Sequence, residues 1–184
     1  MTDHPHQLYA VDFTAADQVR LAGFSCGDDL WSKHVAEWIR GSDVLDSLQK
    51  GTRVWLFETA DGEVVGFGSV GTTRWRWPPP DGSYSTIVLI PMLGLDVRFQ
   101  GQPPDPVWRL ARQITSHLIA EARQYVKEWS GAPEGKPQWL VLMVHRDNAR
   151  AIRFYEKCGF EWIPGVVRRN DHLAMKLWIG EPAV

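Results

Sequence analysis

The chain has 184 residues, of which 44% are hydrophobic and 23% charged. This length and balance are typical of one globular domain and argue against disorder. Twenty basic and 22 acidic residues give a net charge of −2, which offers no overall attraction to nucleic acid. The two cysteines lack CxxC spacing, and no apolar run has the length of a membrane span. We therefore expect a cytoplasmic protein with no metal, and neither a nucleic acid nor a membrane among its partners.

The first half of the chain predicts a strand, three short helices and a hairpin. The expected elements are a strand at 7–13, a short helix at 14–22, two helices within 27–50, and strands at 53–58 and 63–71. Asp61–Gly62 lies between the last two strands and is a strong signal for a tight turn. Residues 75–84 contain three consecutive prolines and are expected to form a loop.

The second half alternates strands and helices. The expected elements are a long strand at 86–97, a helix from 105 to about 129, a linker at 130–137, a buried strand at 139–144, a short helix at 149–157, and strands near 160–167 and 172–179. Pro91 and Gly94 interrupt the long strand, so we expect a bulge or bend there. Strands and helices in this order predict a mixed α/β fold.

Residues 145–160 are the most informative segment of the sequence. Asp147 or Asn148 can cap the short helix, and Gly159 can end it in the left-handed conformation. Tyr155 falls on the apolar face of this helix. From the residues alone, the simplest interpretation is a core tyrosine whose hydroxyl is hydrogen-bonded within the protein.

The run from Asn148 to Phe160 resembles the N-x-x-A-x-x-x-Y-x-x-x-G-F signature of the GNAT superfamily of acetyl-CoA-dependent N-acetyltransferases. The order of elements along almost the whole chain is similar as well. The resemblance implies an α/β fold whose central mixed, mostly antiparallel sheet has a splayed central strand pair and flanking helices. It also implies a single acyltransferase domain over 1–184, with an acceptor-side half at 1–85 and a cofactor-side half at 86–184.

The resemblance further implies roles for individual residues. Tyr155 would give a proton to the thiolate of coenzyme A as a general acid, and Asn148 would form a hydrogen bond near the pantetheine arm. Backbone groups of Leu95 and Val97 would pair with pantetheine amides, although a simple β-bulge explains the bend equally well. The expected cofactor-binding residues are Leu95, Asp96, Val97, Arg98, Gln100, Gly101, Gln102 and Asn148.

The expected pyrophosphate loop departs from the family pattern Q/R-x-x-G-x-G/A. Arg98 and Gly101 match that pattern, but Pro103 stands where glycine or alanine belongs. Backbone N–H groups at a helix N-terminus hold anions, and proline has no N–H to offer. Two interpretations stay open: a longer loop that works with side chains such as Arg109, or a loop whose affinity for the cofactor is degraded.

The acceptor-side residues are less defined than the cofactor side. The acceptor amine must lose a proton, and Glu58, Glu63 and Asp96 are candidate bases that are equally at home as surface or turn residues. Cys26 is expected to be a buried small residue and not a nucleophile. The interleaved arginines and tryptophans of 74–78 could stack on a substrate, or could seal a neighbouring subunit of a homodimer.

We expect an N-acetyltransferase whose acceptor is a small amine, a peptide N-terminus or a lysine. One alternative is a GNAT-fold binding module with a lapsed pyrophosphate loop. A second alternative rests on Phe24-Ser25-Cys26-Gly27 and the Gln-Gly that follows the long strand, which resemble the GNAT toxins that acetylate aminoacyl-tRNA. The net charge of −2 does not favour that alternative.

Overall fold

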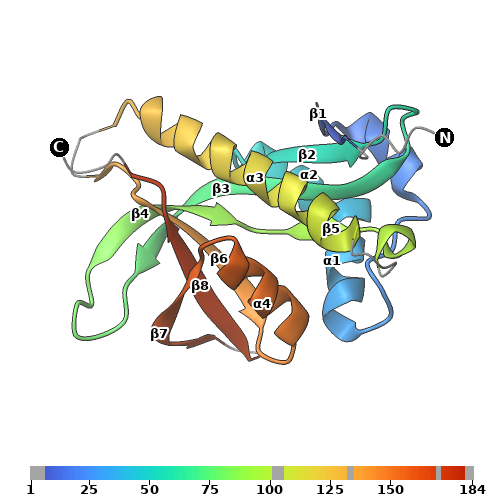
Figure 1. Cartoon of the computed structure of the whole chain (residues 1–184). Helices are drawn as coiled ribbons and strands as arrows, with labels where there is room; N and C mark the ends of the chain where they lie inside the picture. Colours follow the sequence, from blue (N-terminus) through green and yellow to red (C-terminus); the bar gives the residue numbers. More distant parts are fainter. Residues whose placement is uncertain (1–6, 101–105, 132–134, 169–170, 181–184) are drawn as a thin grey trace. The chain divides into compact units, whose positions relative to one another are not determined.

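A computed structural model describes residues 7–100, 106–131, 135–168 and 171–180 (Figure 1). Its strands are β1 (Tyr9–Asp12), β2 (Arg53–Glu58), β3 (Val64–Arg76), β4 (Tyr84–Ile90), β5 (Leu93–Leu95), β6 (Trp139–His145), β7 (Glu161–Arg168) and β8 (His172–Trp178). Its α-helices are α1 (Leu30–Arg40), α2 (Asp43–Gln49), α3 (Pro106–Lys127) and α4 (Ala149–Lys157). Two 3-10 helices are η1 (Ala15–Leu21) and η2 (Val97–Phe99).

The predicted fold class is confirmed: this is a mixed α/β fold with an eight-stranded, mostly antiparallel sheet and flanking helices. The chain forms two compact units. The first consists of residues 1–69 and 92–117, and the second of residues 70–91 and 118–184. Strand β3 and helix α3 each contribute residues to both units.

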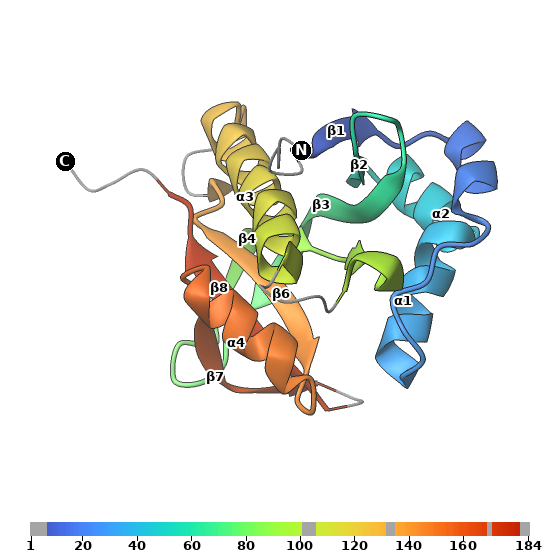
Figure 2. The ribbon, with the colours of Figure 1, turned by 45° about the vertical axis from the view of Figure 1, so that its right-hand side comes forward.

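In the first unit, β1, β2 and the early part of β3 are neighbours in that order, and β5 adds to β3. The β1–β2 pairing is antiparallel with Tyr9 opposite Glu58, and β5 pairs antiparallel with Gly66 opposite Leu95. Helices α1 and α2 lie beside β2 and β3 (Figure 2). The core that they bury includes Leu21, Phe24, Ala36, Trp38, Ile39, Val44, Val54, Leu56, Val64 and Phe67.

In the second unit, the remaining part of β3 is followed in the sheet by β4, β6, β8 and β7. Only β4 and β6 are parallel; the other described pairs are antiparallel. Leu140, Val141 and Leu142 are almost completely buried, as expected for a strand covered on both faces. The β4–β6 pairing ends at Ile90 and Leu142, whereas β6 continues to His145. This is the parting of central strands that the resemblance implied.

The predicted loop at 75–84 is too long. Strand β3 runs on to Arg76, which pairs with Tyr84 at the start of β4. Trp75 is buried in a cluster with Ile87, Val141 and Ala174, and this packing extends the strand into a stretch that the nearby prolines obscured. The connection between the two strands is therefore 77–83.

The predicted interruption of the long strand is confirmed at Pro91, which separates β4 from β5. Ser69 of β3 fills the gap. Its hydroxyl donates to the Met92 carbonyl at 2.9 Å and accepts from the Met92 N–H at 3.0 Å. The Ser69 N–H donates to the same carbonyl at 3.0 Å, so the backbone groups of Met92 keep partners where the regular ladder stops.

Candidate functional site

Helix α4 of the second unit has the caps that its sequence predicts. The side-chain oxygen of Asn148 accepts from the Ala151 N–H at 3.0 Å, which identifies Asn148 as the N-cap. At the other end, Gly159 has φ +89°, and the Phe160 N–H donates to the Tyr155 carbonyl at 3.0 Å. Local groups thus satisfy backbone hydrogen bonds at both ends of α4, and these caps fix the start and end of the helix that carries Tyr155.

Tyr155 is half-buried, and its ring meets Phe154 and Phe160 edge-on at centroid distances of 5.3 and 5.7 Å. Burial raises the pKa of its phenol well above the ordinary value, and the nearby Cys158 thiol adds to the effect. Among the residues that the structure describes, none hydrogen-bonds its hydroxyl. The Tyr155 phenol is therefore protonated at neutral pH, and no described residue is the hydrogen-bond partner expected of a structural core tyrosine.

The segment from Leu95 to Gln100 belongs to the first unit, and it satisfies much of its own hydrogen bonding. The Val97 N–H donates to the Ser25 carbonyl at 2.7 Å, and the Val97 carbonyl accepts from the Gln100 N–H at 3.1 Å. The Gln100 side chain donates to the carbonyls of Leu95 at 2.6 Å and Cys26 at 2.9 Å. A pantetheine arm would therefore have to replace these bonds in order to pair with the backbone there.

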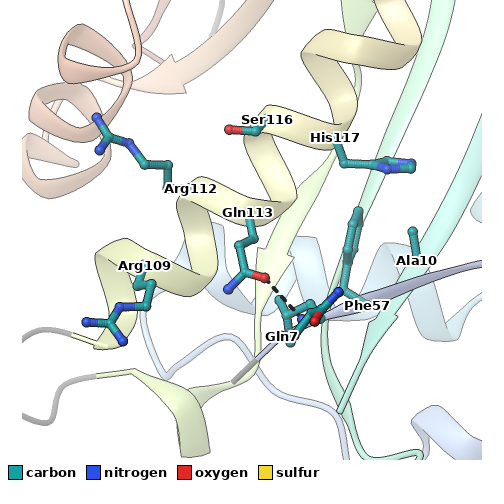
Figure 3. Close-up of a pocket in the computed structure, with 9 residues that line it drawn as sticks. Gln7, Ala10, Phe57, Arg109, Arg112, Gln113, Ser116 and His117 are labelled. Atoms are coloured by element: carbon teal, nitrogen blue, oxygen red, sulfur yellow. Dashed lines mark hydrogen bonds between the residues drawn. The ribbon is translucent and has the colours of Figure 1, made fainter. Parts of the chain in front are cut away.

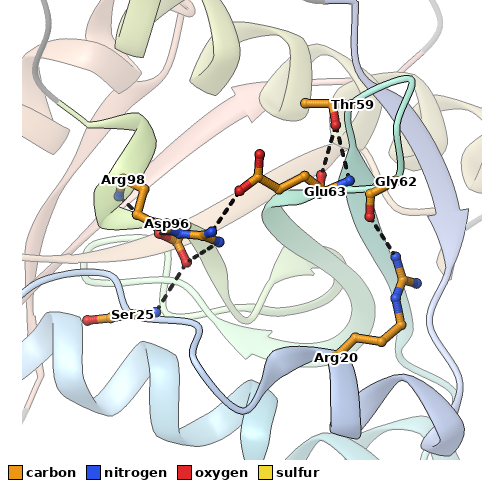
Figure 4. Close-up of polar contacts among 7 residues, drawn as sticks. All are labelled: Arg20, Ser25, Thr59, Gly62, Glu63, Asp96 and Arg98. Atoms are coloured by element: carbon orange, nitrogen blue, oxygen red, sulfur yellow. Dashed lines mark hydrogen bonds and ion pairs between the residues drawn. The ribbon is translucent and has the colours of Figure 1, made fainter.

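Asp96 is the centre of an ion-pair network in the first unit (Figure 4). Its carboxylate is only 1% exposed, and it accepts from Arg98 Nε at 2.9 Å and from the Arg98 N–H at 2.9 Å. The same guanidinium reaches Glu63 at 2.7 Å, and the Ser25 N–H donates to Asp96 at 3.4 Å. Because a buried carboxylate needs such partners, we expect the main role of Arg98 to be stabilisation of the Asp96 charge within the fold.

Arginines also hold the other candidate bases. Glu58 is nearly buried and pairs with Arg20 at 2.7 Å; Arg20 in turn binds Asp17 at 3.0 Å and the Gly62 carbonyl at 3.1 Å. Glu63 is held by Arg98, as described above. Glu58 thus pairs with Arg20, whereas Glu63 and Asp96 share Arg98, and the structure favours none of the three as the acceptor base.

The other predicted positions are placed as follows. Gly101 and Gln102 lie outside the described residues. Cys26 is buried, and desolvation, together with the Asp96 charge, raises the pKa of its thiol to about 12, so it is not a nucleophile at neutral pH.

Within the described ranges, no three His, Cys, Asp or Glu side chains are grouped so as to hold a metal ion. No helix in those ranges is both long and apolar enough to cross a membrane.

The arginines and tryptophans of 74–78 face different surroundings in the second unit. The guanidinium groups of Arg74 and Arg76 lie 5.0 and 5.7 Å from the ring centroid of exposed Tyr84. Trp75 is buried, and Trp77 donates from Nε1 to the Ser85 hydroxyl at 2.8 Å. Arg74, Arg76 and neighbouring Tyr84 are therefore exposed to solvent, whereas Trp77 is half-buried.

The architecture is the GNAT fold, the class that the Asn148–Phe160 signature implied. No protein-family model and no curated protein sequence matches the chain. Solved structures share the fold at low identity. They include the AtaT toxin complexed with acetyl-methionyl-tRNAfMet (17% identity, 94% of this chain and 95% of that chain, TM-score 0.65). A second is AtaTR bound with acetyl-CoA, at 19% identity over 94% of this chain and 93% of that chain, with a TM-score of 0.65. A third is the KacTA–DNA complex, at 16% identity over 94% of each chain, with a TM-score of 0.62.

Proposed function

We propose that the protein is an acetyl-CoA-dependent N-acetyltransferase whose catalytic domain spans residues 1–184. It transfers the acetyl group directly to a primary amine while both substrates are bound. The observation that carries this proposal is Tyr155: a protonated phenol on a capped helix, with a hydroxyl that no described residue engages. The likeness in fold to AtaTR bound with acetyl-CoA supports the choice of acyl donor.

In the proposed reaction, the amine nitrogen attacks the thioester carbonyl carbon, and the carbon–sulfur bond of the resulting intermediate breaks. The sulfur leaves as a thiolate that needs a proton, and Tyr155 donates it. The Tyr155 phenol carries that proton throughout the neutral range, and water returns a proton to the phenolate after the transfer. The amine loses its own proton to water, since the three candidate carboxylates are already paired with arginines.

The residues proposed to bind acetyl-CoA are Asn148 at the start of α4 and the segment that follows β5, each described by itself. Asn148 uses its side-chain oxygen for the helix cap, so its NH₂ group is the part available for the pantetheine arm. The remaining residues are those of the segment after β5, in which Arg98 and Gln100 would exchange internal bonds for ligand bonds. Gly101 and Gln102 are proposed to meet the pyrophosphate through backbone N–H groups.

A second candidate acceptor is the α-amine of an aminoacyl-tRNA. The observation that favours it is the likeness in fold, over 94% of this chain, to AtaT complexed with acetyl-methionyl-tRNAfMet. A free amine and an aminoacyl ester present the same nucleophile, so the chemistry at Tyr155 is unchanged. The two acceptors differ in salt dependence, because tRNA binding releases counterions and weakens steeply as salt rises.

The acyl donor is tested by calorimetric titration of the protein with acetyl-CoA. A micromolar dissociation constant supports the enzyme and justifies assays with amines, peptides and charged tRNA. Absence of binding at millimolar acetyl-CoA contradicts the proposal and favours the alternative of a GNAT-fold binding module.

The role of Tyr155 is tested by Tyr155→Phe. Loss of the proton donor should lower the turnover rate about 10²-fold or more, the usual worth of a general acid. The affinity for acetyl-CoA should stay within a few-fold of wild type, because the ring and its packing remain. Steady-state kinetics and calorimetry measure the two effects separately. A variant that retains the full rate removes Tyr155 from the mechanism.

A further inference from the structure

Ser69 is the last residue that β3 contributes to the first unit, and its side chain is fully buried. On either side of this position, β3 pairs with two different strands: Gly68 lies opposite Leu93 of β5, and Gly71 lies opposite Leu89 of β4. Between these two pairs, β3 has two residues where the opposite side has three. One extra residue on one side is a β-bulge, and it interrupts the ladder of backbone hydrogen bonds. Ser69 therefore lies where the backbone alone does not supply every bond.

The Ser69 hydroxyl completes the pairing on the β5 side of this interruption. In a regular antiparallel pair, two opposed residues exchange N–H···O=C bonds in both directions. The Ser69 N–H donates to the Met92 carbonyl at 3.0 Å, as such a pair requires. In the other direction, the Met92 N–H donates to the Ser69 hydroxyl at 3.0 Å, and the hydroxyl donates to the Met92 carbonyl at 2.9 Å. A side-chain oxygen thus takes the place of a backbone carbonyl.

Few groups could replace this hydroxyl. It donates and accepts at the same time, which serine and threonine do well, cysteine does weakly, and alanine and valine do not do at all. The preceding residue on the opposite side, Pro91, has no N–H to offer as a donor. The cavity of about 490 Å³ drawn in Figure 3 is lined by neither Ser69 nor Met92, so it does not supply a water molecule in place of the hydroxyl. Removal of the hydroxyl therefore leaves the Met92 N–H without its acceptor.

A change at Met92 is passed directly to β5, because β5 begins at the next residue. The backbones of β3 and β5 approach each other closely, and a Cβ atom at Gly66 would lie only 2.5 Å from the Gly94 carbonyl oxygen. β5 ends at Leu95, whose backbone groups are among those proposed to pair with pantetheine. The place where Met92 is held therefore helps to determine where these groups lie.

We propose that Ser69 is a positioning residue for acetyl-CoA, whose hydroxyl fixes the strand that leads to the pantetheine-pairing backbone. This inference rests on the proposed function. Ser69 acts through Met92 and β5 and is not itself proposed to touch either substrate. Its loss should therefore weaken the binding of acetyl-CoA, whereas loss of the Tyr155 hydroxyl should lower the turnover rate.

The test compares Ser69→Ala with Ser69→Thr and Ser69→Val, two variants of equal shape of which only threonine keeps the hydroxyl. Calorimetry measures the affinity for acetyl-CoA, and steady-state kinetics at saturating acetyl-CoA measures kcat. Ser69→Ala and Ser69→Val should bind acetyl-CoA about tenfold more weakly than wild type, the usual worth of one hydrogen bond. Their kcat should stay within about threefold of wild type, because the proton donor is unchanged. Ser69→Thr should recover most of the affinity.

Val44→Ala is the control for a general loss of stability, because Val44 is fully buried on α2 and takes no part in the proposed site. It should lower the midpoint of unfolding but leave the affinity for acetyl-CoA within about twofold of wild type. Equal affinity of wild type and Ser69→Ala, or an equal loss in Ser69→Thr and Ser69→Val, would overturn the inference and leave the enzyme proposal intact. Absence of acetyl-CoA binding by wild type would contradict the proposed function itself, and this inference with it.

Amide hydrogen exchange of wild type adds a measurement that needs no variant to fold. The Met92 N–H should exchange as slowly as the amides of neighbouring β3, because the Ser69 hydroxyl holds it in a hydrogen bond. Fast exchange at Met92 would show that the hydroxyl does not hold the strand, and would overturn the inference whatever the variants do.

Discussion

Gly94 of β5 shows how closely the first unit packs around the strand that precedes the candidate site. A Cβ atom at this position would lie 2.6 Å from Phe67 Cε1, 2.8 Å from the Cys26 sulfur and 3.0 Å from Val35 Cγ1. Real Cβ atoms essentially never approach other atoms more closely than 3.0 Å, and Phe67 and Cys26 are buried in the core with little freedom to move. A glycine is therefore needed here for space.

We predict that Gly94→Ala lowers the free energy of unfolding by about 1–3 kcal/mol, the usual cost of overpacking a core. Gly23→Ala is the matched control, because a Cβ atom at Gly23 has no atom within 4 Å. It should change stability by less than about 0.5 kcal/mol. Urea unfolding followed by tryptophan fluorescence measures both. Equal stability of the two variants would show that the strand can shift to accept a methyl group.

The ion-pair network is the part of the candidate site that local sequence could not reveal. Arg98 was assigned to the cofactor because it fits a phosphate-loop motif, yet in the structure it binds Asp96 and Glu63. Glu63 is 35 residues away, at the hairpin turn, and no spacing rule connects the two positions.

At the scale of elements, α4 combines a structural and a proposed functional role in one side chain. The Asn148 oxygen caps the helix, and its NH₂ group is proposed to meet acetyl-CoA. The two roles use different atoms of the amide, so different substitutions separate them.

We predict that Asn148→Ala lowers the free energy of unfolding by about 1 kcal/mol through loss of the cap. Asn148→Asp should preserve stability, because a carboxylate also caps a helix and interacts well with its positive end. Both variants lack the NH₂ donor, so both should bind acetyl-CoA more weakly than wild type. Thermal unfolding and calorimetry give the two readouts. Wild-type affinity in Asn148→Asp would remove the amide from the ligand site.

Elements with a local signal were predicted well from the sequence. The caps of α4, the Asp61–Gly62 turn and the break at Pro91 each depend on a few adjacent residues whose conformational preferences are strong. The end of β3 was missed because its last residues are held by distant packing. Trp75 is buried against β6 and β8 residues, and three prolines immediately beyond it suggested a loop.

At the scale of the whole molecule, the chain passes from one unit to the other three times, after Ser69, Pro91 and His117. Neither unit is therefore a continuous stretch of sequence. The first unit needs residues 92–117, which supply β5 and the start of α3. Ile114 on α3 is fully buried, and its Cδ1 would be only 2.8 Å from a Cβ atom at Gly66.

We predict that a fragment of residues 1–91 does not fold cooperatively, because it lacks these core contributions to the first unit and most of the second. Urea unfolding should show a sloping change in fluorescence for the fragment and a sigmoidal transition for the full chain. A sigmoidal transition in the fragment would mean that its remaining core is sufficient alone.

The order of the elements along the chain also decides which strands can pair first during synthesis. When the ribosome has released residue 91, β4 can already pair with β3, but its parallel partner β6 lies some fifty codons downstream. At translation rates of about 5–20 residues per second, the other edge of β4 waits for several seconds. That edge carries Val88, Leu89 and Ile90, an apolar run of the kind that joins other chains when left unpaired. The nascent chain is therefore most exposed to pairing with other chains between the appearance of β4 and that of β6.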